Sequence, residues 1–94
     1  MSKTNNGAQL ITLERARQVN QEGWTQEHDT EHASAELACA AECYLRHYLK
    51  DPKATMYWPW EIHWWKPKDD LRNLIKAGAL IAAEIDRIQK RKAK

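Results

Sequence analysis

The chain contains no phenylalanine, and among its 94 residues it has only three glycines and three prolines. It also lacks a run of about 18 apolar residues, the length that a helix needs to cross a bilayer, so we expect no membrane contact. Its first seven residues lack the apolar core of a signal peptide, so we expect a cytoplasmic protein. A chain this short forms one domain at most, which leaves no room for a catalytic domain beside a regulatory one.

Cysteine is scarce, and its placement argues against a disulfide. Cys39 and Cys43 are four residues apart. On a helix they would share one face but lie along the axis, which is an awkward geometry for a disulfide bond. We therefore expect two free thiols, as is usual in a reducing compartment.

The charges are distributed unevenly, although the net charge is only +2. The last eight residues carry five Lys and Arg side chains and no acid, whereas the segment from Glu22 to Glu42 holds six acids and no Lys or Arg. Cations are favoured at a helix C-terminus, where we place the basic end. Binding to duplex nucleic acid needs a basic face, so the acidic middle excludes duplex nucleic acid as the expected partner.

Helical periodicity of apolar residues predicts an all-α fold, a small bundle of three main helices within a single domain spanning residues 1–94. Thr12 is the expected cap of the first helix, which ends near Gly23; the second helix covers residues 31–49, and the third follows Asp69 or Asp70. Residues 1–9 are expected to be loose, and residues 88–94 to form a basic tail. The Trp connection, defined as residues 51–68, is expected to pack over one end of the bundle.

The same periodicity predicts which helix faces are buried. In the second helix these are Leu37, Ala41, Tyr44, Leu45, Tyr48 and Leu49, and in the third they are Leu71, Leu74, Ile75, Gly78, Ile81, Ala82, Ile85 and Ile88. Three short helices enclose only a thin core, and Gly78 with the alanines of the second helix offers faces for close packing. We therefore expect a homo-oligomer.

An acidic segment ahead of the second helix is dense in potential metal ligands, namely His28, Asp29, Glu31, His32 and Glu36. On a helix, His28, His32 and Glu36 would lie on one face. Imidazole and carboxylate groups at this spacing can hold a divalent metal such as zinc or manganese, and carboxylates alone can hold magnesium beside a phosphate. The alternative is a solvated helix start, where acids are favoured by the helix dipole.

Four tryptophans fall in the Trp connection, beside several cations. Aromatic faces next to cations suit a base ring with a nearby phosphate. The candidate ligand-binding residues are Trp60, Trp64, Trp65, Lys66, Lys68 and Arg72. The same cluster also suits a protein interface, where Trp is a frequent hot spot, or a structural cover over the core.

Two groups of residues together resemble a family of small accessory proteins encoded by tailed phages and prophages. The first group is Gly23-Trp24-Thr25, Glu27-His28-Asp29, Glu31-His32, Glu36-Leu37-Ala38, Ala40-Ala41 and Tyr44. The second is Trp58-Pro59-Trp60, Trp64-Trp65-Lys66-Pro67, Asp70, Arg72, Leu74, Lys76-Ala77-Gly78-Ala79-Leu80-Ile81 and Ala83-Glu84-Ile85. The resemblance covers most of the chain and implies a viral accessory role in the cytoplasm of a bacterial host.

The chain is also similar, more weakly, to the all-α nucleoside triphosphate pyrophosphohydrolases of the MazG type, which hold magnesium between carboxylates of two helices. This likeness implies a metal role for Glu31, Glu36 and Asp70, although the Glu-x-x-Glu pair of that family is absent.

Three functions therefore stay open. The leading hypothesis is a phage accessory protein that binds a nucleotide-like small molecule and sequesters a host defence signal. The second is a metal-dependent pyrophosphohydrolase. The third is an inhibitor that binds a host protein. No set of nucleophile, base and orienting residue is evident, so we expect a binding protein without catalytic residues.

Overall fold

A computed structural model describes residues 4–22 and 35–92, which form three α-helices and one short 3-10 helix. The α-helices are α1 (Gly7–Glu22), α3 (Glu36–Tyr48) and α4 (Asp70–Lys92), and the 3-10 helix is η1 (Ile62–Trp64). No strand occurs in these two ranges, which confirms the predicted all-α bundle.

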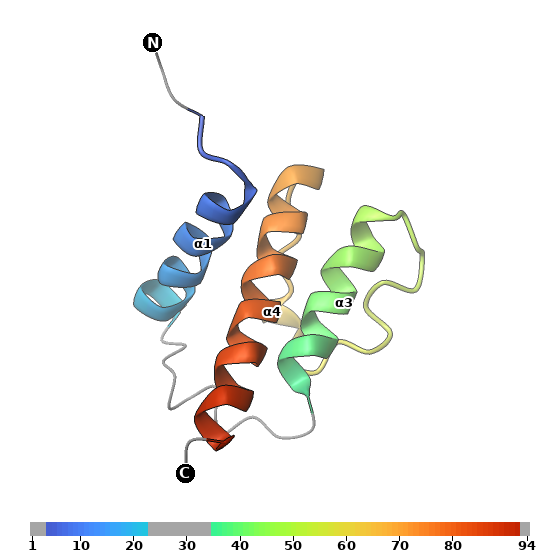
Figure 1. Ribbon diagram of the computed structural model, residues 1–94. Coiled ribbons are helices and arrows are strands. Elements are labelled where there is room, and N and C mark those ends of the chain that lie inside the picture. Colours follow the sequence, from blue (N-terminus) through green and yellow to red (C-terminus); the bar gives the residue numbers. More distant parts are fainter. Residues whose placement is uncertain (1–3, 23–34, 93–94) are drawn as a thin grey trace.

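The three α-helices lie side by side, with α4 in the middle (Figure 1). The molecule measures 44 × 38 × 21 Å, and its short dimension is about two helix diameters. The Trp connection leaves α3 and returns behind α3 and α4 in the view of Figure 1 before α4 begins. The fold is thus a single layer of helices with the connection on one of its two faces.

The core between α3 and α4 is built largely from small side chains. Its buried members are Leu37, Ala40, Ala41, Tyr44, Ala77, Leu80 and Ala83, and the partly buried Trp58, Trp60 and Trp65 pack against them. Alanines let two helices approach closely but supply little apolar volume. The indoles of the connection supply that volume in a chain that has no phenylalanine.

The start of α1 differs from the sequence expectation. The amide of Gln9 donates to Oδ1 of Asn6 at 2.9 Å, and the amide of Asn6 donates to Oε1 of Gln9 at 2.8 Å. This reciprocal pair is a capping box, so α1 begins at Gly7 instead of after Thr12. The Thr12 hydroxyl donates to the Ala8 carbonyl within the helix, at 2.9 Å.

α3 is shorter than the second helix predicted for residues 31–49. Ala35 is left-handed, with φ 65°, so α3 begins after it at Glu36. At the other end of α3, Lys50 is also left-handed, and the amides of Lys50 and Asp51 bond back to the carbonyls of His47 and Arg46 in a Schellman motif.

The predicted cap of the third helix is confirmed, because Oδ1 of Asp69 accepts from the amide of Arg72 at 2.8 Å. The helix continues to Lys92, and its last turn contains the basic residues Lys90, Arg91 and Lys92. This is the favourable position for cations beside the helix dipole.

The predicted buried faces were wrong for most of their large residues. The exposed ones are Leu45, Tyr48, Leu49, Leu71, Leu74, Ile81, Ile85 and Ile88. Instead, α4 buries Asn73, Ile75, Lys76, Ala77, Ala79, Leu80, Ala83 and Arg87. The reason is the position of α4 in the layer: it buries the sides that face α1, α3 and the connection, whereas its main apolar stripe points out of the layer.

Gly78 lies where α1 crosses α4. A Cβ added at this position would stand 2.5 Å from Cδ1 and 2.8 Å from Cγ1 of Ile11. The glycine is therefore explained by the close helix crossing that the sequence suggested.

We expect Gly78→Ala to lower the free energy of unfolding by about 1 kcal/mol, because overpacking costs about 1–3 kcal/mol and the better helix propensity of alanine returns only about 1 kcal/mol. Ile11→Ala removes both clashing atoms. In urea unfolding, the double variant should therefore be more stable than the sum of the two single effects predicts. Strict additivity would show that Ile11 does not limit the space at Gly78.

Candidate functional site

Three of the tryptophans belong to the cover of the core. The Trp65 ring lies 4.7 Å from the Tyr44 ring and 5.0 Å from that of Trp58, between centroids. Trp58 donates from Nε1 to the Glu61 carbonyl at 3.1 Å, and Trp60 donates from Nε1 to Oε1 of Glu36 at 3.4 Å. Of the three alternatives for the Trp cluster, a structural cover over the core is therefore the one that applies to Trp58, Trp60 and Trp65.

Trp64 has a different environment. It ends η1, is half-buried, and lines a small cleft between α1, α3, α4 and the connection. The Nζ of Lys66 lies 5.4 Å from the centroid of the Trp64 ring, and the His63 ring lies 5.0 Å from it. An aromatic face and a cation therefore meet at the edge of this cleft.

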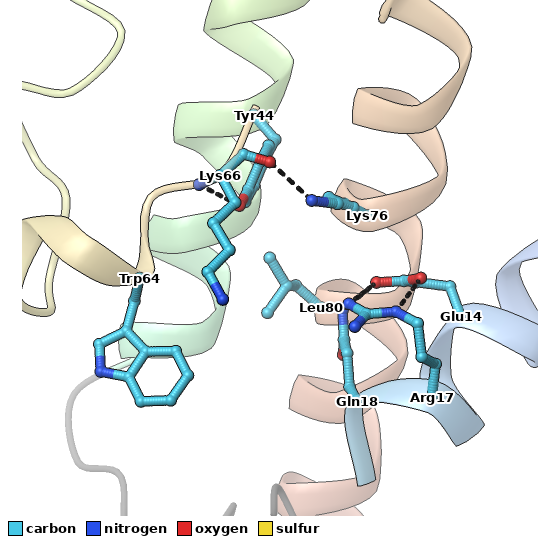
Figure 2. Close-up of a pocket in the computed structure, with 8 residues that line it drawn as sticks. All are labelled: Glu14, Arg17, Gln18, Tyr44, Trp64, Lys66, Lys76 and Leu80. Carbon is cyan, nitrogen blue, oxygen red and sulfur yellow. Dashed lines mark hydrogen bonds and ion pairs between the residues drawn. The ribbon is translucent and has the colours of Figure 1, made fainter. Parts of the chain in front are cut away.

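Figure 2 shows the cleft, whose lining residues are Glu14, Arg17, Gln18, Tyr44, Trp64, Lys66, Lys76 and Leu80. Its cavity volume is about 20 Å³, enough for a single water molecule. A larger ligand would therefore rest across the mouth of the cleft, against Trp64 and the cations, instead of entering it.

Glu14 is a buried carboxylate at the α1 side of the cleft, with an exposed fraction of 1%. Its oxygens accept from Nε and Nη2 of Arg17 at 2.8 and 2.7 Å, from Nε2 of Gln18 at 3.3 Å, and from Nη2 of Arg72 on α4. Burial alone would raise the pKa of Glu14, but the hydrogen bonds and charges of the two arginines outweigh it, so the pKa lies below its usual value.

Lys76 and Tyr44 fix the segment that carries Trp64 and Lys66. The Nζ of Lys76, which is buried, donates to the carbonyl of Lys66 at 2.6 Å and lies 5.6 Å from the centroid of the Tyr44 ring. The amide of Lys66 donates to the Tyr44 hydroxyl at 3.2 Å. Figure 2 shows both bonds converging on Lys66 from α3 and α4.

Gln18 contributes an unusual group to the same cleft. Its side chain is buried, and its Oε1 has no hydrogen-bond partner within the described part of the chain. A buried amide oxygen without a partner carries a desolvation cost. A donor in the cleft, from a water molecule or from a ligand, would remove that cost.

The structure brings only part of the predicted ligand set to this place. Trp64 and Lys66 lie at the cleft, whereas Trp60 and Trp65 pack on the core. Arg72 holds Glu14. The side chain of Lys68 is exposed, and its backbone amide donates to Oδ1 of Asn73 at 2.7 Å.

Sequence reasoning did not name the other lining residues as candidates for a site; these are Glu14, Arg17, Gln18, Tyr44, Lys76 and Leu80. The spacing of Glu14, Arg17 and Gln18 by three and four residues was a visible signal that these side chains share a helix face. Arg72, the partner of Glu14 on α4, is 58 residues away along the chain. No spacing in the sequence indicated this contact.

The predicted metal site is only partly covered by the described residues. His28, Asp29, Glu31 and His32 lie outside them, and Glu36 accepts a hydrogen bond from Trp60. Within residues 4–22 and 35–92, no group of three or more His, Cys, Asp or Glu residues is placed to hold a metal ion. Both cysteines are free, as predicted, and burial raises the pKa of the Cys43 thiol.

Comparison with family models, curated proteins and solved structures found no match to this chain. Among the helices that the structure describes, none combines the length and apolarity needed to cross a bilayer. The likeness to phage accessory proteins and to MazG-type enzymes therefore stays a prediction.

We expect Glu14→Gln to lower the free energy of unfolding at neutral pH by about 2 kcal/mol, because it leaves two arginines without their buried counter-charge. Because the folded pKa of Glu14 is lowered, its ionised form adds stability above the unfolded pKa of about 4.3. This contribution is lost as the pH falls through the lowered folded pKa.

Thermal unfolding between pH 3 and pH 8 checks the expectation. The difference between the wild type and Glu14→Gln should stay constant from pH 6 to pH 8 and shrink below about pH 4.3. Glu42→Gln removes an exposed ion pair with Arg46 and is the matched control, expected to cost less than about 0.5 kcal/mol. Equal losses in the two variants would contradict a special role for Glu14.

Proposed function

We propose that the protein binds a nucleotide-like small molecule, an aromatic ring that carries a phosphate, across the mouth of the cleft. The observation that carries the proposal is the placement of Trp64 beside Lys66, with Nζ 5.4 Å from the ring centroid, at the edge of a cleft that also contains Arg17 and Lys76. A flat aromatic face suits a base, and clustered cations suit a phosphate.

The cations around the cleft support an anionic ligand. Within residues 4–22 and 35–92, Arg17, Lys66 and Lys76 line the cleft beside the carboxylate of Glu14, and Arg72 reaches the same carboxylate. In the proposed arrangement, Trp64 stacks on the base and Lys66 contacts the phosphate. An amino group on the base would be a suitable donor to Oε1 of Gln18.

We expect binding without turnover at this cleft. Among the described residues, its lining includes one carboxylate, whose oxygens are already held by Arg17, Gln18 and Arg72, and no histidine or cysteine. A metal-dependent hydrolase needs two or more such ligands around a cation. The resemblance to phage accessory proteins extends the proposal to a biological role, the sequestration of a nucleotide signal of host defence in the bacterial cytoplasm.

Calorimetric titration with a panel of cyclic and linear nucleotides tests the proposal. We expect at least one nucleotide to bind, with an affinity that falls as salt is raised. Trp64→Ala should weaken binding by roughly 5- to 150-fold, the equivalent of the 1–3 kcal/mol that stacking on a base contributes, and Lys66→Ala should weaken it by a similar factor.

The matched controls are Tyr57→Ala and Lys53→Ala, which remove an exposed aromatic and an exposed cation from the same connection. Both should bind as the wild type does. Absence of binding across the panel, or equal losses in the controls and the cleft variants, would overturn the proposal. Release of phosphate or pyrophosphate during the titration with magnesium or manganese present would favour the hydrolase instead.

A further inference from the structure

The outward face of α4 carries a continuous apolar stripe. We define the α4 stripe as Leu71, Leu74, Gly78, Ile81, Ile85 and Ile88, which are spaced alternately by three and four residues. This is the repeat of the a and d positions of a coiled coil, which runs straight along one side of a helix. The five large side chains are between 36% and 62% exposed.

The α4 stripe lies on the face of the layer opposite the Trp connection. The neighbours of α4 on one side come from α1, where Glu14 meets Arg72 and Arg15 meets Asp86. On the other side Ala77 and Leu80 pack toward α3. A helix turns by 100° per residue. The large side chains of the stripe therefore lie between these two contact sides and away from Lys76, which bonds to the connection. Gly78, at the edge of the stripe, lies against Ile11 of α1.

Apolar residues of α3 extend this face. The connection covers the side of α3 that carries Glu36 and Cys43, whose neighbours are Trp60 and Tyr57. Helical spacing puts Leu45 and Tyr48 on the other side of α3, where both are exposed. The sequence pattern predicted that these residues and those of the stripe would be buried, and they gather on one face of the layer.

We propose that the α4 stripe is the interface at which two copies of this chain associate, with their α4 helices antiparallel. In this arrangement each apolar residue of the stripe meets one of the second copy: Leu71 lies opposite Ile88, and Leu74 lies opposite Ile85. Ile81 lies opposite Gly78, which Ile11 of the same chain already contacts. The stripe is thus complementary to itself under a two-fold rotation, as an isologous interface requires.

The charges at the two ends of α4 select the antiparallel direction. Lys90, Arg91 and Lys92 stand at its end, whereas Asp69 and Asp70 stand at its start, with Asp70 in an ion pair with Lys50. An antiparallel pair keeps the two basic ends apart, places each beside the start of the other helix, and aligns the helix dipoles favourably. A parallel pair would bring the two basic ends together.

The available area fits a small dimer. The stripe exposes on the order of 400 Å² of apolar surface per chain, which is the size of functional patches on single chains. Two stripes with their flanking residues Leu45 and Tyr48 approach the roughly 1,200 Å² total at the lower end of stable interfaces. The inference does not depend on the proposed ligand, because the cleft opens on the other face of the layer.

Sedimentation equilibrium from 1 to 200 µM tests the association. We expect the wild type to have twice the mass of the 11.0 kDa chain at the higher concentrations. Ile81→Asp and Ile85→Asp should each raise the dissociation constant by about 100-fold or more, because they bury a charge in an apolar interface. Their helix content should be unchanged, because both side chains are exposed in the single chain.

Ile62→Asp is the matched control, since Ile62 is an exposed isoleucine of η1 on the connection, and it should leave the dimer intact. A wild type that is monomeric at 200 µM would overturn the proposal. The proposal would also be overturned if Ile81→Asp and Ile85→Asp dimerised with the same dissociation constant as the control Ile62→Asp.

Disulfide trapping tests the direction of the helices, in a Cys39→Ser background that leaves only the buried Cys43. The double variant Leu74→Cys with Ile85→Cys should form a covalent dimer on mild oxidation. Neither single variant should form a covalent dimer. In a single variant the two thiols would lie eleven residues apart along the paired helices, about 16 Å, which is beyond the reach of a disulfide. Trapping of the Leu74→Cys single variant, or none of the double variant, would overturn the antiparallel arrangement.

Discussion

The position of α4 as the middle helix of a single layer is the constraint on which the rest of the structure depends. The three helices of the described residues do not enclose a core between them, so the layer that they form has two broad faces to cover. The Trp connection covers one face, and its indoles complete a core that is otherwise made mainly of alanines. The other face carries the α4 stripe, where we propose that a second copy of the chain binds.

The candidate site is a consequence of the same arrangement. Tyr44 and Lys76 hold the connection against the helices by hydrogen bonds to the backbone of Lys66. With the backbone held there, Trp65 packs against Tyr44, whereas Trp64 lines the cleft. The proposed binding role thus falls to Trp64 and the structural role to its neighbour Trp65. The ion pair of the buried Glu14 with Arg72 ties α1 to the same place.

The helices and the Asp69 cap were predictable because they depend on local spacing and on side chains close in sequence. The buried faces were not, because α4 is apolar on several sides and periodicity does not tell which side meets α1 or α3. Trp64 and Trp65 look alike in the sequence, and only the fold of the connection separates them. The Glu14 cluster was missed because its long-range partner, Arg72, lies on another helix.

Amide hydrogen exchange, resolved by residue, tests most directly whether α4 is the helix on which the layer is built. We expect the amides of α4 near Ala79 and Leu80 to exchange most slowly, through global unfolding only. The amides of α1 should exchange faster, because that helix docks through Ile11 and the polar side chains Glu14 and Gln18. Protection in α1 equal to or greater than that in α4 would show that the layer is not built on α4.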